Sequence, residues 1–172
     1  MARDPHRPPG EVRLESSARV AAVVSRYHAD LTGAMLASAE RTLQEAGLTQ
    51  DVEVVWVPGS FELPIVAQRF ARRPDISAVL CIGVIIKGET RHDEFIAHGV
   101  VNGLVSASME TGTPCLMGVL TCETLGQARA RALGEDRELD KGIEIGRAAV
   151  EVLAALDQAK SAPSTGALGF TR

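Results

Sequence analysis

Four short apolar runs alternate with helical patterns along this 172-residue chain, and that alternation limits its possible folds more than any other feature. The runs cover residues 20–24, 52–57, 78–86 and 115–120. The longest, AVLCIGVII, contains no polar side chain apart from one cysteine. Strands that are apolar throughout are buried on both faces, as in a parallel sheet covered by helices. The sequence therefore predicts an α/β domain.

The segments between these runs have the period of amphipathic helices. Helices are predicted around residues 31–43, 63–70, 96–108, 123–133 and 142–156. Because crossovers between parallel strands are right-handed, these helices cover both faces of the sheet. We expect a flavodoxin-like, three-layer αβα fold with a central four-stranded parallel sheet. Val12 and Leu14 alternate with charged residues and predict an additional N-terminal edge strand.

The composition limits the domain plan and the classes of partner. We expect an N-terminal arm over residues 1–17, one domain over 18–158 and a disordered tail over 159–172. The net charge of −4 argues against nucleic-acid binding. No apolar run approaches the roughly 20 residues of a membrane span, and the first residues lack the apolar core of a secretory signal. The three cysteines have no metal-binding spacing, so we expect no metal site and a cytoplasmic protein.

Polar and aromatic residues follow the predicted strands, where ligands bind in open parallel sheets. The first strand is followed by Tyr27, the second by a segment that includes Glu62, and the third by a turn from Gly88 to His92. Thr90 is a candidate N-cap, and His92 then lies in the first helical turn. Each has an ordinary structural alternative: Tyr27 as a rim aromatic, Glu62 as a partner of the helix dipole, and His92 as an incidental residue of a solvated helix start.

Four segments, in order, resemble the 6,7-dimethyl-8-ribityllumazine synthase family. They are VPGSFELP at 57–64, IGVIIKGETRH at 82–92, GTPCLMGVLTCETLGQARARALG at 112–134 and DKG at 140–142. The likeness extends over about residues 12–158. It implies an enzyme of riboflavin biosynthesis that condenses 5-amino-6-ribitylamino-uracil with 3,4-dihydroxy-2-butanone 4-phosphate. It also implies that no cofactor is needed and that the chain forms homopentamers or an assembly of pentamers.

The resemblance assigns roles to individual positions. Tyr27 matches the aromatic residue that stacks on the pyrimidine. Ser60, Phe61 and Glu62 match the backbone groups and carboxylate that hold the pyrimidine and its ribityl chain, and Ile85 and Ile86 line the ring pocket. Gly88, Glu89 and Thr90 match the phosphate-binding turn, and His92 matches the proton-transfer residue. Met117, Arg131 and Lys141 match residues that a neighbouring subunit contributes.

Several positions depart from the family pattern. His28 stands where Asn usually follows the stacking aromatic, Arg91 where Pro or Thr is common, and Asp93 where Phe or Tyr is common. Met117 replaces an aromatic residue, and its thioether still packs well against rings. The loop at 134–142 is slightly longer than in the capsid-forming members of the family that the chain resembles, which favours free pentamers.

Two other functions remain open at this level. A non-catalytic flavin or lumazine binder would keep the ring pocket, but it would need no phosphate site. An FMN protein of the flavodoxin type would carry a Ser/Thr/Gly-rich phosphate loop after the first strand, where this chain has SRYHADLTG. The sequence therefore favours the enzyme.

Overall fold

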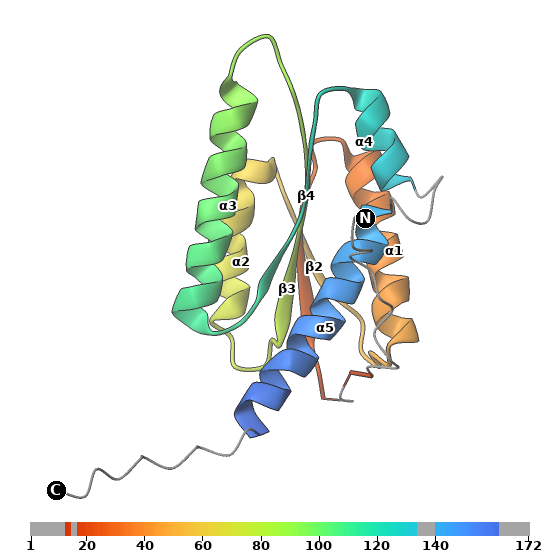
Figure 1. The fold of residues 1–172 in the computed structure, drawn as a ribbon, viewed down its shortest axis with the longest axis vertical. Coiled ribbons are helices and arrows are strands. Elements are labelled where there is room, and N and C mark those ends of the chain that lie inside the picture. Colours follow the sequence, from red (N-terminus) through yellow and green to blue (C-terminus); the bar gives the residue numbers. More distant parts are fainter. Residues whose placement is uncertain (1–12, 15–16, 134–139, 162–172) are drawn as a thin grey trace, which may run out of the picture.

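A parallel sheet lies between two helical layers in the computed structural model (Figure 1). The structure describes residues 13–14, 17–133 and 140–161. Helices α2 and α3 cover one face of the sheet, and α1, α4 and α5 cover the other. The predicted three-layer α/β fold is confirmed.

The four strands lie in the order β2-β1-β3-β4, and all pairs are parallel. The strands are β1 Val20–Ser25, β2 Glu53–Val57, β3 Ala78–Ile86 and β4 Cys115–Cys122. The helices are α1 Ala29–Glu45, α2 Leu63–Ala71, α3 His92–Thr111, α4 Leu125–Ala132 and α5 Lys141–Ser161, with a 3-10 turn, η1, at Ser60–Glu62. The strand order reverses between β1 and β3, which places the expected ligand crevice at their carboxyl ends.

Alternate residues of the central strands enter two separate cores. Val20, Ala22 and Val24 of β1 pack with α1, α4 and α5, whereas Ala21 and Val23 pack with α2 and α3. All five side chains are essentially inaccessible to solvent. Burial on both faces explains why these strands are apolar at consecutive positions, because no position faces water.

The DKG segment anchors α5 against α1. Asp140 Oδ1 accepts hydrogen bonds from the N–H groups of Gly142 and Ile143 at 2.8 and 3.1 Å, and its Oδ2 accepts one from Ser38 Oγ at 2.9 Å. Gly142 lies so close to α1 that an added Cβ would overlap the carbonyl oxygen of Met35. The aspartate and the glycine therefore both have a packing reason, and Lys141 between them is held at the start of α5.

Some predicted features differ from the structure or lie outside it. Arg13 and Leu14 are not in the sheet; the N–H of Leu14 instead donates to the Ala46 carbonyl at 2.8 Å. The structure does not describe the rest of the predicted edge strand or most of the arm and tail. Of the loop at 134–142, residues 134–139 also lie outside the described residues. Helix α5 continues to Ser161, into the segment predicted as tail.

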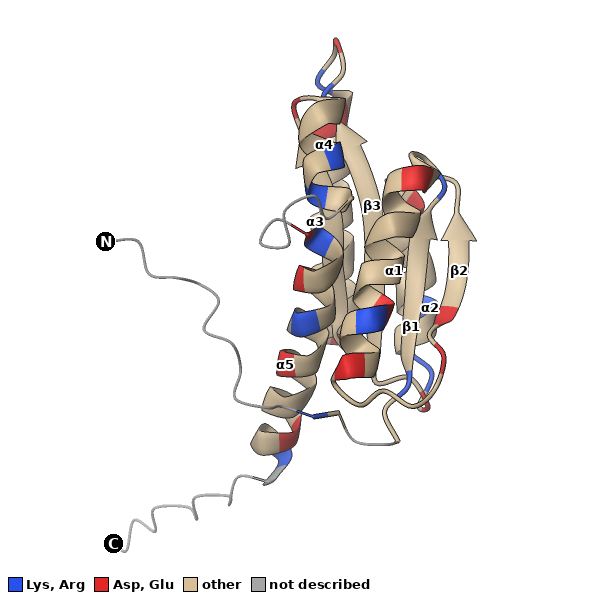
Figure 2. Ribbon diagram, turned by 90° about the vertical axis from the view of Figure 1, so that its right-hand side faces the viewer, with Lys and Arg blue, Asp and Glu red and all other residues tan. Residues whose placement is uncertain are grey.

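The outer helices carry charges of both signs. Along α5, Lys141, Glu144, Arg147 and Glu151 follow one another in the sequence. Figure 2 shows basic and acidic positions alternating along this helix. This surface is therefore not the one-signed basic stripe of a nucleic-acid-binding protein. Among the described residues, no helix is both long and apolar enough to span a membrane.

Candidate active site

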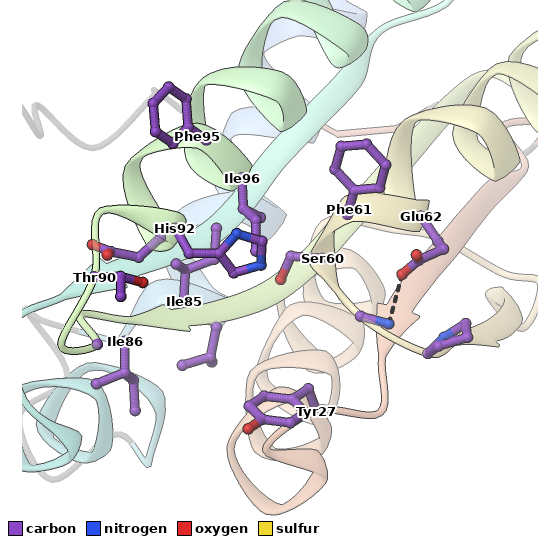
Figure 3. A pocket seen from close by; sticks show the side chains of 15 residues that line it. Tyr27, Ser60, Phe61, Glu62, Ile85, Ile86, Thr90, His92, Phe95 and Ile96 are labelled. Atoms are coloured by element: carbon purple, nitrogen blue, oxygen red, sulfur yellow. Dashed lines mark hydrogen bonds between the residues drawn. The ribbon is translucent and has the colours of Figure 1, made fainter.

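A cavity of about 780 Å³ opens at the carboxyl ends of β1, β2 and β3 (Figure 3). This volume is within the usual range for small-molecule sites. Nine residues predicted for the site line it: Tyr27, Ser60, Phe61, Glu62, Ile85, Ile86, Gly88, Thr90 and His92. They come from three different strand ends, so the parallel topology brings them together.

Two of the three exposed aromatic residues that line this cavity follow strands β1 and β2. Tyr27 follows β1 and is 68% exposed, and Phe61 in η1 is 64% exposed. The Phe61 ring lies over α3 at Gly99, where an added Cβ would come within 3.5 Å of the ring. Exposed rings beside a cavity with aliphatic residues such as Ile85 form a suitable surface for a flat heterocycle.

Glu62 joins η1 to α2 and turns its carboxylate back over the loop. Its Oε2 accepts a hydrogen bond from the N–H of Gly59 at 2.9 Å, the dashed line in Figure 3. An ionised carboxylate has about four acceptor sites. One of them fixes the side chain, and others are available to hydroxyl donors of a ligand.

Ser60 is the first residue of η1 and is only 6% exposed. Its Oγ has no hydrogen-bond partner among the described residues. The hydroxyl lies against β3 at Gly83, where an added Cβ would be 2.5 Å from Oγ. A buried hydroxyl without a partner destabilises a fold, so such a group in a cavity wall needs an explanation.

His92 is the first residue of α3 and lines the cavity, as predicted. The predicted N-cap at Thr90 is wrong, because the N-cap is Arg91 and its side chain makes no capping hydrogen bond. Arg91 has φ −78° and ψ 18°, not the extended backbone from which Ser or Thr usually caps a helix. The N–H groups in the first turn of α3 therefore receive no hydrogen bond from the side chain of the N-cap residue, Arg91.

The cations beside the Gly88–Thr90 turn are already paired. Lys87 Nζ lies 2.8 Å from Glu123 Oε2, and this hydrogen bond raises the pKa of Lys87. Arg91 binds Glu94 through two nitrogens at 2.7 and 2.9 Å. Glu89 and Asp93 add further negative charge nearby. A phosphate dianion at this turn would compete with these carboxylates for Lys87 and Arg91, and a cation from elsewhere would strengthen its binding.

Four of the predicted site residues do not line the cavity. Glu89 is exposed in the turn, and Met117 is 46% exposed on β4. Arg131 on α4 is exposed and donates from Nη1 to the Gln127 carbonyl at 3.1 Å. Lys141 donates to Glu144 Oε1 at 2.5 Å. Met117, Arg131 and Lys141 are the three that the family likeness assigns to a neighbouring subunit.

The cavity also includes residues that the sequence reasoning did not select. They are Pro58, Gly59, Val84, Asp93, Phe95 and Ile96. Phe95 and Ile96 follow His92 by three and four positions, so they share its face of α3. Helical spacing from His92 could have identified both. The described residues hold no cluster of three or more metal-ligating side chains.

The fold and cavity define a three-layer parallel α/β protein with a small-molecule site at the switch point of its sheet. Residues 17–157 match the family model described as 6,7-dimethyl-8-ribityllumazine synthase. The chain therefore belongs to the 6,7-dimethyl-8-ribityllumazine synthase family.

Individual relatives carry the same name. The protein of Stenotrophomonas maltophilia strain K279a is 38% identical over 150 residues, which cover 87% of this chain and 96% of the relative. A protein of Thermus thermophilus is 41% identical over 140 residues, covering 81% and 88%. The chloroplastic protein of Arabidopsis thaliana is 41% identical over 135 residues, covering 78% and 59%. The chain thus matches about three fifths of the length of its plant relatives.

Proposed function

We propose that this chain is a lumazine synthase that condenses 5-amino-6-(D-ribitylamino)uracil with 3,4-dihydroxy-2-butanone 4-phosphate. The observation that carries this proposal is the cavity at the switch point, where an aromatic rim, a carboxylate and His92 meet. These groups match the substrates: a flat ring, a hydroxylated chain and a centre that undergoes proton transfers. Membership of the family supports the same reaction.

The chemistry requires positioning more than a strong catalyst. The 5-amino group attacks the ketone and water leaves to form a C=N bond. Phosphate then leaves by elimination, and the ribitylamino nitrogen closes the second ring with loss of a further water. Holding both substrates in one cavity supplies proximity. His92 lies where an imidazole can accept and return protons during these steps.

The direct test combines the purified protein with both substrates and follows the absorbance and fluorescence of the lumazine together with phosphate release. We expect lumazine and phosphate to form in equal amounts. Omission of either substrate is the control. Lumazine binding without turnover would favour the non-catalytic binder, and phosphate release without lumazine would overturn the proposed reaction.

We further propose a homopentamer that works in the cytoplasm. Exposed apolar residues lie on two sides of the subunit, as expected for the two different surfaces of a ring contact. One set is Phe61, Ile65, Phe95, Val105 and Met109 on η1, α2 and α3; the other is Leu125 and Leu133 at the two ends of α4, on the opposite face of the sheet. The three cysteines are unpaired, which fits a reducing compartment.

Native mass spectrometry tests the pentamer. Five chains of 18.2 kDa give a particle of about 91 kDa. A capsid of pentamers would be far larger, and a monomer would contradict the ring.

In this ring we propose that each site is shared between neighbours. The paired state of Lys87 and Arg91 supports an external cation for phosphate, and Arg131 is exposed on α4. His92→Ala and Arg131→Ala should each impair every site of its own homo-oligomer.

A mixture of the two variants tests the shared site. Unfolding and refolding them together should restore about a quarter of the sites by random mixing. Mixed rings whose activity equals only the average of the parents would contradict shared sites.

A further inference from the structure

The Tyr27 side chain is highly exposed, but its ring contacts a neighbouring imidazole. It is the only tyrosine of the chain, and 68% of it is accessible. Its backbone N–H donates to Ser25 Oγ at 3.2 Å. Its ring makes one aromatic contact among the described residues, with the imidazole of His28. The ring centroids are 4.9 Å apart and the planes are inclined by 80°, which is the favourable edge-to-face geometry.

The backbone of His28 is fixed firmly to the body of the domain. His28 is the N-cap of α1 and has φ 60° and ψ 50°, the one left-handed non-glycine residue described. Its carbonyl accepts hydrogen bonds from the N–H groups of Leu31 and Thr32 at 2.9 and 3.0 Å. Thr32 is fully buried, and its hydroxyl donates to the Ser25 carbonyl at 2.8 Å. The hydrogen bonds of this turn therefore fix the direction of the Cα–Cβ bond of His28.

The imidazole itself is not needed for this backbone geometry. The helix start uses the His28 carbonyl, and the side chain makes no capping hydrogen bond. Glycine adopts the left-handed conformation without steric cost, and Asn, Asp and His adopt it more readily than most other residues. The turn therefore does not require the imidazole, and the one aromatic contact of this ring among the described residues is with Tyr27.

We propose that His28 is a positioning residue that holds the Tyr27 ring in the orientation required for stacking on the bound heterocycle. The inference rests on the proposed function only in taking Tyr27 as the stacking residue. An exposed ring that is already oriented loses less conformational freedom on binding, so affinity rises without any contact between His28 and the ligand. The contribution of His28 must then depend on Tyr27.

A double-mutant cycle on binding of 6,7-dimethyl-8-ribityllumazine tests this dependence. The proteins are the wild type, His28→Gly, Tyr27→Ala and the double variant, titrated by ligand fluorescence. Glycine keeps the left-handed backbone and removes only the side chain. We expect His28→Gly to weaken binding about twofold to tenfold in the presence of Tyr27, the range of one aromatic pair, and to have no effect in its absence. Ala29→Gly, a change in the exposed neighbouring residue, should leave affinity unchanged.

Steady-state kinetics separate an effect on pyrimidine binding from a general structural effect of the substitution. His28→Gly should raise KM for the pyrimidine and leave kcat and KM for the phosphate substrate unchanged. Equal losses with and without Tyr27 would show that His28 contacts the ligand itself, and no loss in either background would show that its ring is irrelevant; both overturn the inference. A wild type that binds lumazine but does not form it would refute the proposed function and leave the cycle valid. A wild type that does not bind lumazine would refute both.

Discussion

The buried hydroxyl of Ser60 predicts an unusual response to mutation. Leaving a polar group buried without a partner costs about 1–3 kcal/mol. Ser60→Ala removes that group and leaves a gap of one oxygen atom next to Gly83, which offsets part of the gain. We expect the variant to be more stable by about 1 kcal/mol. For a chain of this length, that corresponds to a rise in Tm of about 2–4 °C.

The same change should weaken ligand binding. A destabilising group that is kept in a cavity wall is typical of stability exchanged for function. If the hydroxyl pairs with the ligand after rotation about χ1, its loss should reduce lumazine affinity about twofold to tenfold. The assays are urea denaturation with a thermal melt, and a fluorescence titration on the same preparation.

Ser108→Ala is the matched control. Ser108 Oγ donates to the Leu104 carbonyl and accepts from the Cys115 N–H, both at 2.9 Å, so it is fully paired. Its removal should lower stability by about 1 kcal/mol and leave lumazine binding unchanged. A lower Tm for Ser60→Ala, as for Ser108→Ala, would refute the reasoning, because it would show that the Ser60 hydroxyl supports the fold.

Three further predictions concern other positions. Gly142→Ala should lower the free energy of unfolding, measured in urea, by about 1–3 kcal/mol, because the added Cβ would overlap the Met35 carbonyl. The control Gly126→Ala in α4, where a Cβ has room, should not destabilise the protein. His92→Ala should lower kcat about 100-fold with little change in lumazine affinity, and an unchanged rate would exclude proton transfer by His92. Burial raises the pKa of the Cys81 thiol, so Cys81 should react with a thiol reagent only after unfolding; rapid labelling of Cys81 itself in the native protein, located by peptide mass spectrometry, would contradict the described core.

The sequence was most informative where burial alone decides the structure. The apolar run at 78–86 became β3 with the predicted bounds, since both of its faces are covered and every position had to be apolar. Local hydrogen bonding was harder to predict. Thr90 has a good capping side chain, but the turn after β3 places Arg91 at the helix boundary instead. The choice depends on turn geometry that residue types do not specify.

Some residues that line the cavity were predicted from the sequence, and others were missed. Residues in the segments after the strands, such as Tyr27, Glu62 and His92, were selected because the carboxyl ends of parallel strands meet at one edge, and all three line the cavity. Phe95 was missed because it reaches the cavity from within α3, and only the phase of that helix reveals this. That the Ser60 hydroxyl has no hydrogen-bond partner within the part of the chain that the structure describes could not be predicted either, since it depends on the close approach of η1 to β3.

Under the proposed function, the two substrates depend on the neighbouring subunit for different groups. The ring-binding part has its aromatic rim and aliphatic floor within a single subunit, as Tyr27, Phe61 and Ile85 show. The phosphate turn has cations in its own chain, but Glu123 and Glu94 already neutralise them. A dianion brought there gains little from paired charges, whereas an unpaired guanidinium offers strong charge-assisted hydrogen bonds. Under the proposed function, the pyrimidine therefore contacts Tyr27 and Phe61 of one subunit beside Met117 of its neighbour, and the phosphate substrate depends on Arg131 of that neighbour.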